Sequence, residues 1–189
     1  EMYPLAFADR DNHHRVTQIM MHIPNEKKNK GVEINNVWAE NVPCIRKDGC
    51  VIHVYAGTYE GMTGVVPNKD SWAADPSHHV RIVSFEVDPG VKITLDPTVP
   101  SAGRNVYLTD SGATVAGKDY IPQTRLKIKP DAEVEITNGD KKSEIWLLEG
   151  DPIGQKMCSF GPVVLATDKE VREANAVVRK EEIKDWPWN

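Results

Sequence analysis

Short runs of alternating apolar and polar residues, each ended by a turn signal, fill the chain between residues 50 and 149. The runs read CVIHVYA, HVRIVSFEV, RNVYLTDSG, TRLKIKP, EVEITNGD and SEIWLLEG. Because successive side chains of a strand point to opposite faces, each run predicts a strand with one buried face. Strands that recur roughly every ten residues are typical of an all-β sandwich or barrel, and one wet face favours antiparallel pairing.

The turn signals between the runs predict how the strands are connected. The tripeptide Asp88-Pro89-Gly90 predicts a turn after the second run. The dipeptide Asn138-Gly139 is the strongest hairpin signal in the chain. We therefore expect the runs on either side of it to pair as a hairpin.

The end of the chain predicts a helix. Thr167 followed by Glu170 forms a capping box, and an apolar stripe at helical spacing runs over residues 171–178. For Trp186 and Trp188, which follow the helix, we expect docking of the tail onto the barrel rather than stacking on a ligand.

The head of the chain has a different pattern. EMYP and VTQIMMHIP predict two strands joined by a polar loop. Two strands cannot build a core alone, so they join the surface of the second barrel or belong to something missing. We therefore divide the chain into a remnant with linker at 1–45 and a barrel with terminal helix and tail at 46–189.

Composition excludes several classes of function. The formal net charge is −5 and the only basic cluster is NEKKNK, which argues against nucleic-acid or membrane binding through a basic face. No stretch approaches the roughly 18 apolar residues that span a membrane. The three cysteines are odd in number and lack CxxC spacing, which favours buried thiols in a reducing compartment. The cytoplasm is the default location, with the nucleus as an alternative in a eukaryote.

Four segments together resemble the pirin family of bicupins. They are EGDPIGQKMCSFGPVVLATDKEVREA near the end, VTQIMMHIP near the start, FEVDPGVKITLDP in the middle and the terminal WPW, which resembles quercetinase-like members. The resemblance implies an all-β fold, a cupin-type β-barrel or jelly roll with a C-terminal α-helix. It also implies that remnant strands of a preceding N-terminal cupin barrel stand before it.

The same resemblance implies a metal ligand at the first residue. In this family the N-terminal barrel holds iron through three histidines and a glutamate, and the last two ligands lie on a His-x-Glu-Met strand. Glu1-Met2 matches the Glu-Met of that strand, so Glu1 is the candidate metal ligand and its histidine partners are expected upstream. Iron is then expected in the intact parent only, and no cofactor in this chain alone.

The second barrel lacks the residues of a cupin metal site. Such a site needs a His-x-His pair and a glutamate on one strand, and the corresponding stretch here has Lys92, Thr94 and Asp96. The later stretch at 129–145 also has no histidine. We therefore expect this barrel to be free of metal.

The six histidines give no obvious chelate. The pairs at 13–14 and 78–79 are adjacent residues, which point to opposite faces on a strand. His22 and His53 stand alone within predicted strands, where satisfied core or edge histidines are more frequent than ligands. A cryptic site formed by the 13–14 pair with Glu1 stays open as an alternative.

Two functions from different classes follow from the resemblance. The first is an iron-dependent dioxygenase of the quercetinase type, acting on a small aromatic, flavonoid-like substrate, in which this chain is the largely non-catalytic half. The alternative is a redox-responsive regulatory module that binds proteins. We expect no catalytic residue in this chain, since even Cys158 lacks histidine and asparagine partners in a recognisable context. Unpaired strand edges predict association with the missing N-terminal cupin half or self-association.

Overall fold

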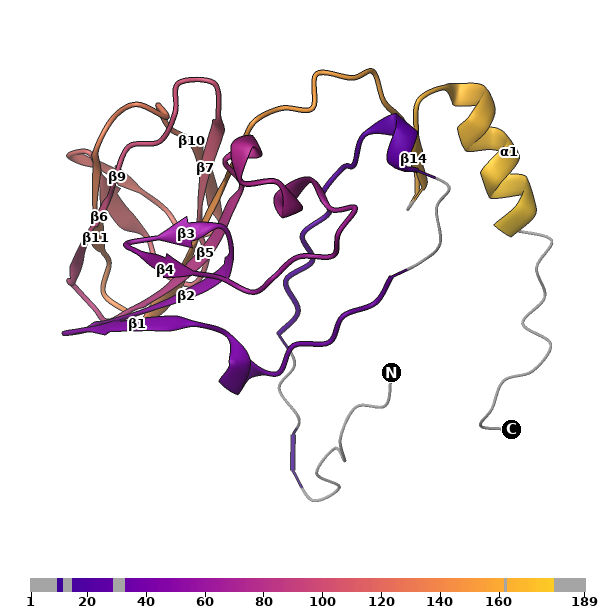
Figure 1. Ribbon diagram of the computed structural model, residues 1–189. Coiled ribbons are helices and arrows are strands. Elements are labelled where there is room, and N and C mark those ends of the chain that lie inside the picture. Colours follow the sequence, from indigo (N-terminus) through magenta and orange to yellow (C-terminus); the bar gives the residue numbers. More distant parts are fainter. Residues whose placement is uncertain (1–9, 12–14, 29–32, 162, 179–189) are drawn as a thin grey trace.

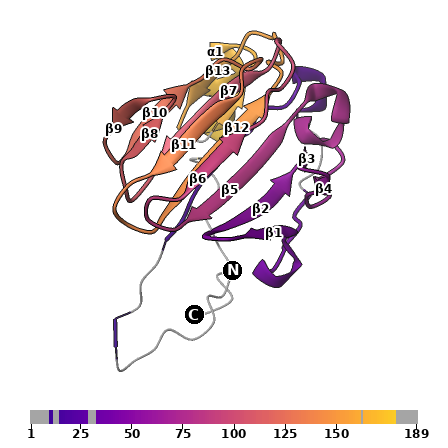
Figure 2. The same ribbon diagram turned by 90° about the vertical axis from the view of Figure 1, so that its left-hand side faces the viewer.

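Two antiparallel sheets pack face to face in the computed structural model, which describes residues 10–11, 15–28, 33–161 and 163–178 (Figures 1 and 2). Within those residues the larger sheet has six strands in the order β1-β2-β5-β12-β7-β10. The smaller sheet has four, in the order β6-β11-β8-β9. Within each sheet, every pair of neighbouring strands is antiparallel, as the alternation of the sequence predicts.

Six of these strands, β2, β5, β7, β10, β11 and β12, fall on the predicted alternating runs, whereas β1, β6, β8 and β9 were not predicted as runs. The larger sheet consists of β1 (Cys44–Lys47), β2 (Cys50–Ala56), β5 (Arg81–Val87), β12 (Ser143–Gly150), β7 (Gly103–Leu108) and β10 (Thr124–Lys127). The smaller sheet consists of β6 (Lys92–Leu95), β11 (Val134–Asn138), β8 (Ala113–Val115) and β9 (Lys118–Tyr120). Two short hairpins lie outside the sheets: β3 (Thr58–Tyr59) with β4 (Met62–Thr63), and β13 (Cys158–Phe160) with β14 (Val163–Leu165).

The core fills the space between the two sheets. Along β12 buried and partly exposed residues alternate without interruption, and β2 follows the same period of two. The fully buried side chains include Val54, Val83, Leu95, Ile136 and Leu147. An all-β barrel built from alternating strands is therefore confirmed.

The two predicted turns have different outcomes. The turn at 88–90 is confirmed, since the amide of Val91 donates to the carbonyl of Asp88 at 3.3 Å and Gly90 has a φ of +70°. The hairpin predicted at Asn138-Gly139 is wrong. The strand before it, β11, lies in the smaller sheet, and the strand after it, β12, lies in the larger one.

Gly139 is required there by a close approach. A Cβ added at Gly139 would lie 2.5 Å from the carbonyl oxygen of Gly112 and 2.4 Å from the hydroxyl of Ser111. The side chain of Asn138 secures the crossing, because its Nδ2 donates to three backbone carbonyls and its Oδ1 accepts from Ser143 at 2.7 Å. The dipeptide thus joins two sheets instead of turning within one.

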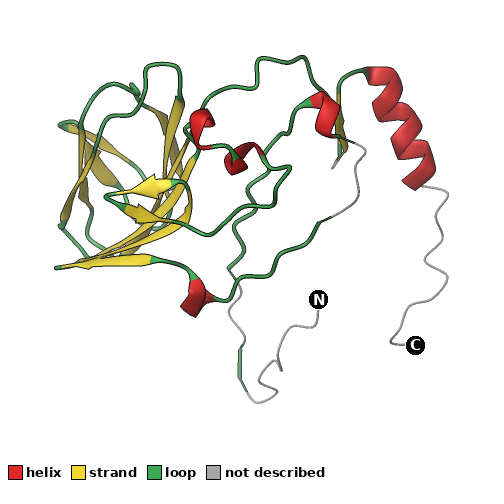
Figure 3. Cartoon of the chain, viewed as in Figure 1, coloured by secondary structure: helices red, strands yellow, loops and turns green. Residues whose placement is uncertain are grey.

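The C-terminal helix α1 (Asp168–Val178) packs against the β13–β14 hairpin, apart from the barrel (Figure 3). The predicted capping box is confirmed: the amide of Thr167 donates to the Glu170 carboxylate at 2.9 Å, and the Glu170 amide donates to the Thr167 hydroxyl at 3.3 Å. Within the described residues no helix is long and apolar enough to cross a membrane. Trp186 and Trp188 lie outside the described residues.

Residues 15–28 form what we call the N-terminal arm, an extended segment that ends in the short helix η1 (Asn25–Lys27). A strand was predicted for VTQIMMHIP, but residues 16–24 pair with no strand among the residues described. The arm is held by two contacts: the backbone amide of Asn25 donates to the Gln155 side chain at 2.7 Å, and the Arg15 guanidinium lies 2.9 Å from the Asp110 carboxylate. The EMYP segment lies outside the described residues.

A second extended segment, residues 33–43, returns from the arm to β1 and contains η2 (Ala39–Asn41). The loop between β4 and β5 carries two further short helices, η3 (Trp72–Ala74) and η4 (Pro76–His78). Together, the arm, the returning segment and this loop lie between the barrel and α1 (Figure 1). This arrangement places one end of the barrel beside the arm.

Candidate functional site

The candidate metal ligand Glu1 lies outside the described residues, and so does the histidine pair at 13–14. The role of Glu1 as a metal ligand therefore stays a prediction. Among the residues that the structure does describe, no group of three or more histidine, cysteine, aspartate or glutamate side chains could hold a metal ion.

His53 is a strand residue whose imidazole contacts a carboxylate of the neighbouring strand. It sits on the outer face of β2, where its Nε2 is 3.2 Å from a carboxylate oxygen of Glu86 on the neighbouring strand β5. The adjacent Tyr55 stacks on Trp146 at a centroid distance of 5.2 Å. This arrangement agrees with the interpretation of His53 as a satisfied sheet residue.

The pair at 78–79 anchors the loop before β5. His78 stacks face to face on Trp72, with ring centroids 3.3 Å apart. Trp72 Nε1 donates to the carbonyl of Asp151 at 2.8 Å, and His79 Nδ1 lies 2.7 Å from the Asp151 carboxylate. This contact with His79 is the main reason that the pKa of Asp151 is lowered from its ordinary value. The two histidines thus contact different residues, His78 the ring of Trp72 and His79 the carboxylate of Asp151.

The inward face of the smaller sheet carries apolar side chains where a metal site was sought. On β6, Lys92 and Thr94 are exposed, whereas Ile93 and Leu95 are buried in the core. Lys92, Thr94 and Asp96, the residues that the sequence analysis compared with inward-facing metal ligands, therefore point away from the interior. Because a one-residue shift moves every side chain to the opposite face, the interior at this position is hydrocarbon.

Charged residues occupy the barrel interior at one end of the larger sheet. Glu149 on β12 stands directly opposite Arg81 on β5 and Arg104 on β7 in the strand register. Both guanidinium groups form ion pairs with the Glu149 carboxylate, each through its Nε atom. The side chains of Arg104 and Glu149 are completely buried, and that of Arg81 is 16% exposed. We call these three residues the mouth cluster.

Arg104 also joins the mouth cluster to the smaller sheet. Its Nη1 donates to the carbonyl of Ala132 at 2.7 Å, and its Nη2 donates to the carbonyl of Asp96. A buried guanidinium is tolerated when its donors meet fixed acceptors in this way. The two guanidinium groups occupy both oxygens of the Glu149 carboxylate, which leaves neither oxygen free for a metal ion.

Analysis of the sequence missed the mouth cluster, although a signal for it was present. Arg104 lies two residues before Val106, Glu149 two residues after Leu147, and Arg81 two residues before Val83. The period of two therefore places all three on the inward face. Tyr59 completes the surroundings: burial raises its pKa, and the Arg81 guanidinium lies 5.7 Å from its ring centroid.

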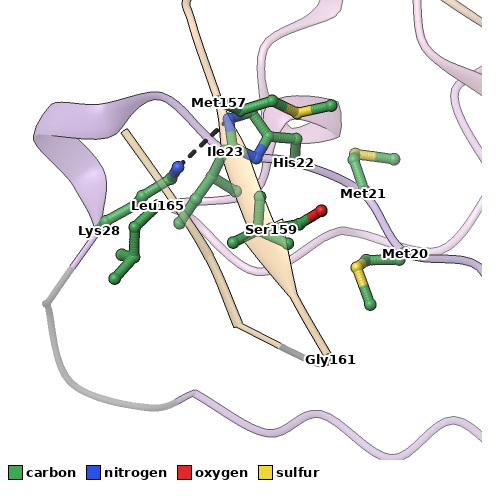
Figure 4. A pocket seen from close by; sticks show the side chains of 10 residues that line it. Met20, Met21, His22, Ile23, Lys28, Met157, Ser159, Gly161 and Leu165 are labelled. Carbon is green, nitrogen blue, oxygen red and sulfur yellow. Dashed lines mark hydrogen bonds between the residues drawn. The ribbon is translucent and has the colours of Figure 1, made fainter. Parts of the chain in front are cut away.

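A cavity of about 540 Å³ lies between the N-terminal arm and the β13–β14 hairpin (Figure 4). We call it the arm pocket. Its walls are mostly apolar, and its lining residues are Met20, Met21, His22, Ile23, Lys28, Met157, Ser159, Gly161, Val164 and Leu165. The arm supplies one wall and the hairpin with its preceding loop supplies the other.

His22 and Lys28 are the polar pair of the arm pocket. Lys28 Nζ lies 3.2 Å from His22 Nε2. The pKa of His22 is lowered, first by burial and then by the charge of Lys28. The pKa of Lys28 is also lowered by burial, although the charge of Glu170 on α1 acts in the opposite direction. Both shifts favour the uncharged forms of the two side chains.

The thiols have the character of structural cysteines. Burial raises the pKa of Cys50 to about 11, which keeps its thiol protonated at neutral pH. The pKa of Cys158 is also raised, and its Sγ lies 3.8 Å from the carbonyl of Ala166. Neither environment activates a nucleophilic thiolate.

Comparison with known proteins places this barrel among the cupins. Residues 82–184 match the family model described as the pirin C-terminal cupin domain. Curated relatives include pirin of Homo sapiens, 25% identical over 183 residues, and pirin of Rattus norvegicus, 25% identical over 166 residues. The human match covers 89% of this chain and 59% of human pirin, and the rat match covers 83% and 53%. The chain thus spans little more than half the length of these relatives.

Solved structures show the same fold. A quercetin 2,3-dioxygenase from Acinetobacter baumannii superposes with a TM-score of 0.70 at 19% identity, over 83% of this chain and 52% of that chain. A second structure of quercetin 2,3-dioxygenase from the same organism gives a TM-score of 0.59 at 23% identity, over 77% and 47%. The predicted cupin-type barrel with a C-terminal helix is confirmed.

Proposed function

This chain belongs to the pirin C-terminal cupin family, and from that premise we propose that it is the metal-free second cupin of a longer, iron-dependent dioxygenase of the quercetinase type. The main support for a metal-free second cupin is the chemistry of its interior. The barrel interior holds hydrocarbon side chains and the Glu149 carboxylate, which is already paired with Arg81 and Arg104, where a metal-binding cupin needs imidazole and free carboxylate donors. The residues of this barrel therefore do not fit an iron ion.

In the proposed parent, iron is held by three upstream histidines together with Glu1. Three imidazoles and one carboxylate are donors that would suit Fe(II), and the ion would supply the oxygen chemistry for an aromatic substrate of the flavonoid type. This chain then contributes Glu1 and half of the scaffold. The names of the Acinetobacter structures support this choice of reaction, and a cytoplasmic location remains part of the proposal.

Iron content tests the assignment. In a longer protein that adds the upstream barrel, Glu1→Ala is expected to abolish most of the bound iron and the oxygen uptake with quercetin. Glu33→Ala, in the exposed segment 33–43, is the matched control and is expected to keep both. Stoichiometric iron in the present chain alone, or full iron in Glu1→Ala, would contradict the proposal.

A second candidate function is a redox-responsive module that binds a protein partner. It is favoured by large apolar side chains that are exposed on the two extended segments, among them Met20, Ile34 and Trp38. The same experiment separates the two functions. A longer protein that binds iron but does not consume oxygen with quercetin would favour the regulatory function.

A further inference from the structure

The arm pocket has the size and the lining of a small-molecule site. Its volume of about 540 Å³ lies within the range of roughly 300–1,000 Å³ that is usual for ligand pockets. Three methionines and the side chains of Ile23, Val164 and Leu165 line it. Methionine is flexible and polarisable, so such walls adapt to apolar ligands of varied shape.

One reactive group faces this apolar lining. Lys28 is an amine at the edge of the pocket, and its Nζ contacts the imidazole of His22 at 3.2 Å (Figure 4). A lysine becomes nucleophilic when it loses its proton, and desolvation favours that loss. The groups that face it are His22, whose pKa is lowered, and Glu170, whose charge works against deprotonation. Desolvation is the larger of the two influences on Lys28.

We propose that Lys28 is a nucleophilic amine that captures apolar aldehydes and ketones in the arm pocket as Schiff bases. The inference does not depend on the iron chemistry proposed above, because no metal takes part. The mostly apolar lining selects the class of carbonyl compound, and the lysine forms the bond.

The chemical step balances without an oxidant or reductant. The lone pair of neutral Lys28 Nζ attacks the carbonyl carbon, and the π electrons of the carbonyl move to its oxygen. His22 Nε2 accepts one of the two protons on the attacking nitrogen and passes it to the alkoxide oxygen, which gives a carbinolamine. It then accepts the second nitrogen proton and passes it to the hydroxyl group. Water leaves and a C=N bond forms. His22 acts here as a proton acceptor at hydrogen-bond distance, which requires its neutral form.

Reductive labelling of the purified chain tests the proposal. The chain is treated with p-anisaldehyde and sodium cyanoborohydride at pH values from neutral to alkaline, and each lysine is quantified by peptide mass mapping. Lys28 is expected to be labelled several-fold faster than Lys27 near neutral pH. Lys27 is a matched internal control, since it is adjacent in sequence and does not line the pocket. Equal rates at the two lysines would overturn the proposal, and this comparison needs no variant.

Two further measurements assign the roles. Pyruvate, a small charged carbonyl compound, is expected to label Lys28 with less preference over Lys27 than p-anisaldehyde does. An equal preference would overturn the apolar class of ligand. His22→Gln is expected to slow labelling of Lys28 without moving the pH at which the rate levels off. A rate unchanged by His22→Gln would remove His22 from the step.

Discussion

Glu149 is the residue on which the buried charges of the barrel depend. Its carboxylate lies between the guanidinium groups of Arg81 and Arg104, and its side chain has no exposed surface. Removing one partner of a buried ion pair leaves an uncompensated charge, which costs several kcal/mol. Substitution of a single residue of the mouth cluster is therefore expected to lower the stability of the fold.

We predict that Glu149→Gln lowers the free energy of unfolding by about 3 kcal/mol or more. The amide keeps the shape of the side chain but leaves two guanidinium groups without an anion. Urea unfolding at neutral pH measures the change. Glu135→Gln is the matched control: it removes an exposed pair with Lys92 and is expected to cost about 0.5 kcal/mol or less. Equal losses in the two variants would show that the cluster does not stabilise the barrel.

At the residue scale the sequence predicts which way a side chain faces, but not what it meets. Alternation alone turns Arg104 and Glu149 inward. That they meet depends on β7 lying beside β12, and the two strands are about forty residues apart in the sequence. For this reason the burial of these charges could be predicted from alternation, but their pairing only from the strand order.

Among the elements, the strands were predicted best and the connections least well. The run CVIHVYA became β2 and SEIWLLEG became β12 without a change of bounds. These strands are set by burial of one face, which alternation records directly. The Asn138-Gly139 dipeptide was misread because a local turn preference cannot tell a hairpin from a crossing between sheets. The arm was misread because an apolar-rich segment becomes a strand only when its backbone pairs with another strand, and residues 16–24 have no such pairing within the described part of the chain.

The loop that carries η3 and η4 is tied to the barrel through Asp151, and this makes its stability depend on pH. The pKa of Asp151 is lowered, mainly by its hydrogen bond with His79. A lowered carboxyl pKa in the folded state stabilises the fold above the ordinary aspartate pKa. That stabilisation is lost as the pH falls through the lowered value.

We therefore predict that Asp151→Asn is less stable than the unchanged chain at pH 7, and that the difference shrinks as the pH falls to about 3. Urea midpoints at a series of pH values measure it. Asp131→Asn, in the exposed loop before β11, supplies the background for loss of one aspartate charge. A difference that stays constant with pH would show that the charge of Asp151 does not hold the loop.

At the scale of the whole molecule, two surfaces of unequal character face solvent. The strands at the edges of the larger sheet carry basic residues such as Arg46, Lys47, Arg125 and Lys127, which discourage edge-to-edge pairing. The two extended segments instead expose apolar side chains, with Val16 79%, Ile34 78% and Trp38 66% exposed. Apolar groups gathered on unpaired backbone are typical of an interaction surface.

The last prediction concerns this surface. We expect the chain by itself to associate through the extended segments, so that light scattering gives a mass above 21.1 kDa that rises with concentration. Ile34→Asp with Trp38→Asp is expected to restore the monomer, because a charge opposes burial of the surface. Ile121→Asp is the matched control, since Ile121 is 77% exposed and belongs to the connection between β9 and β10 rather than to either extended segment. A monomer at every concentration would argue against an exposed docking surface. If the upstream barrel is the natural occupant, adding it should suppress self-association, because both would compete for the same apolar side chains.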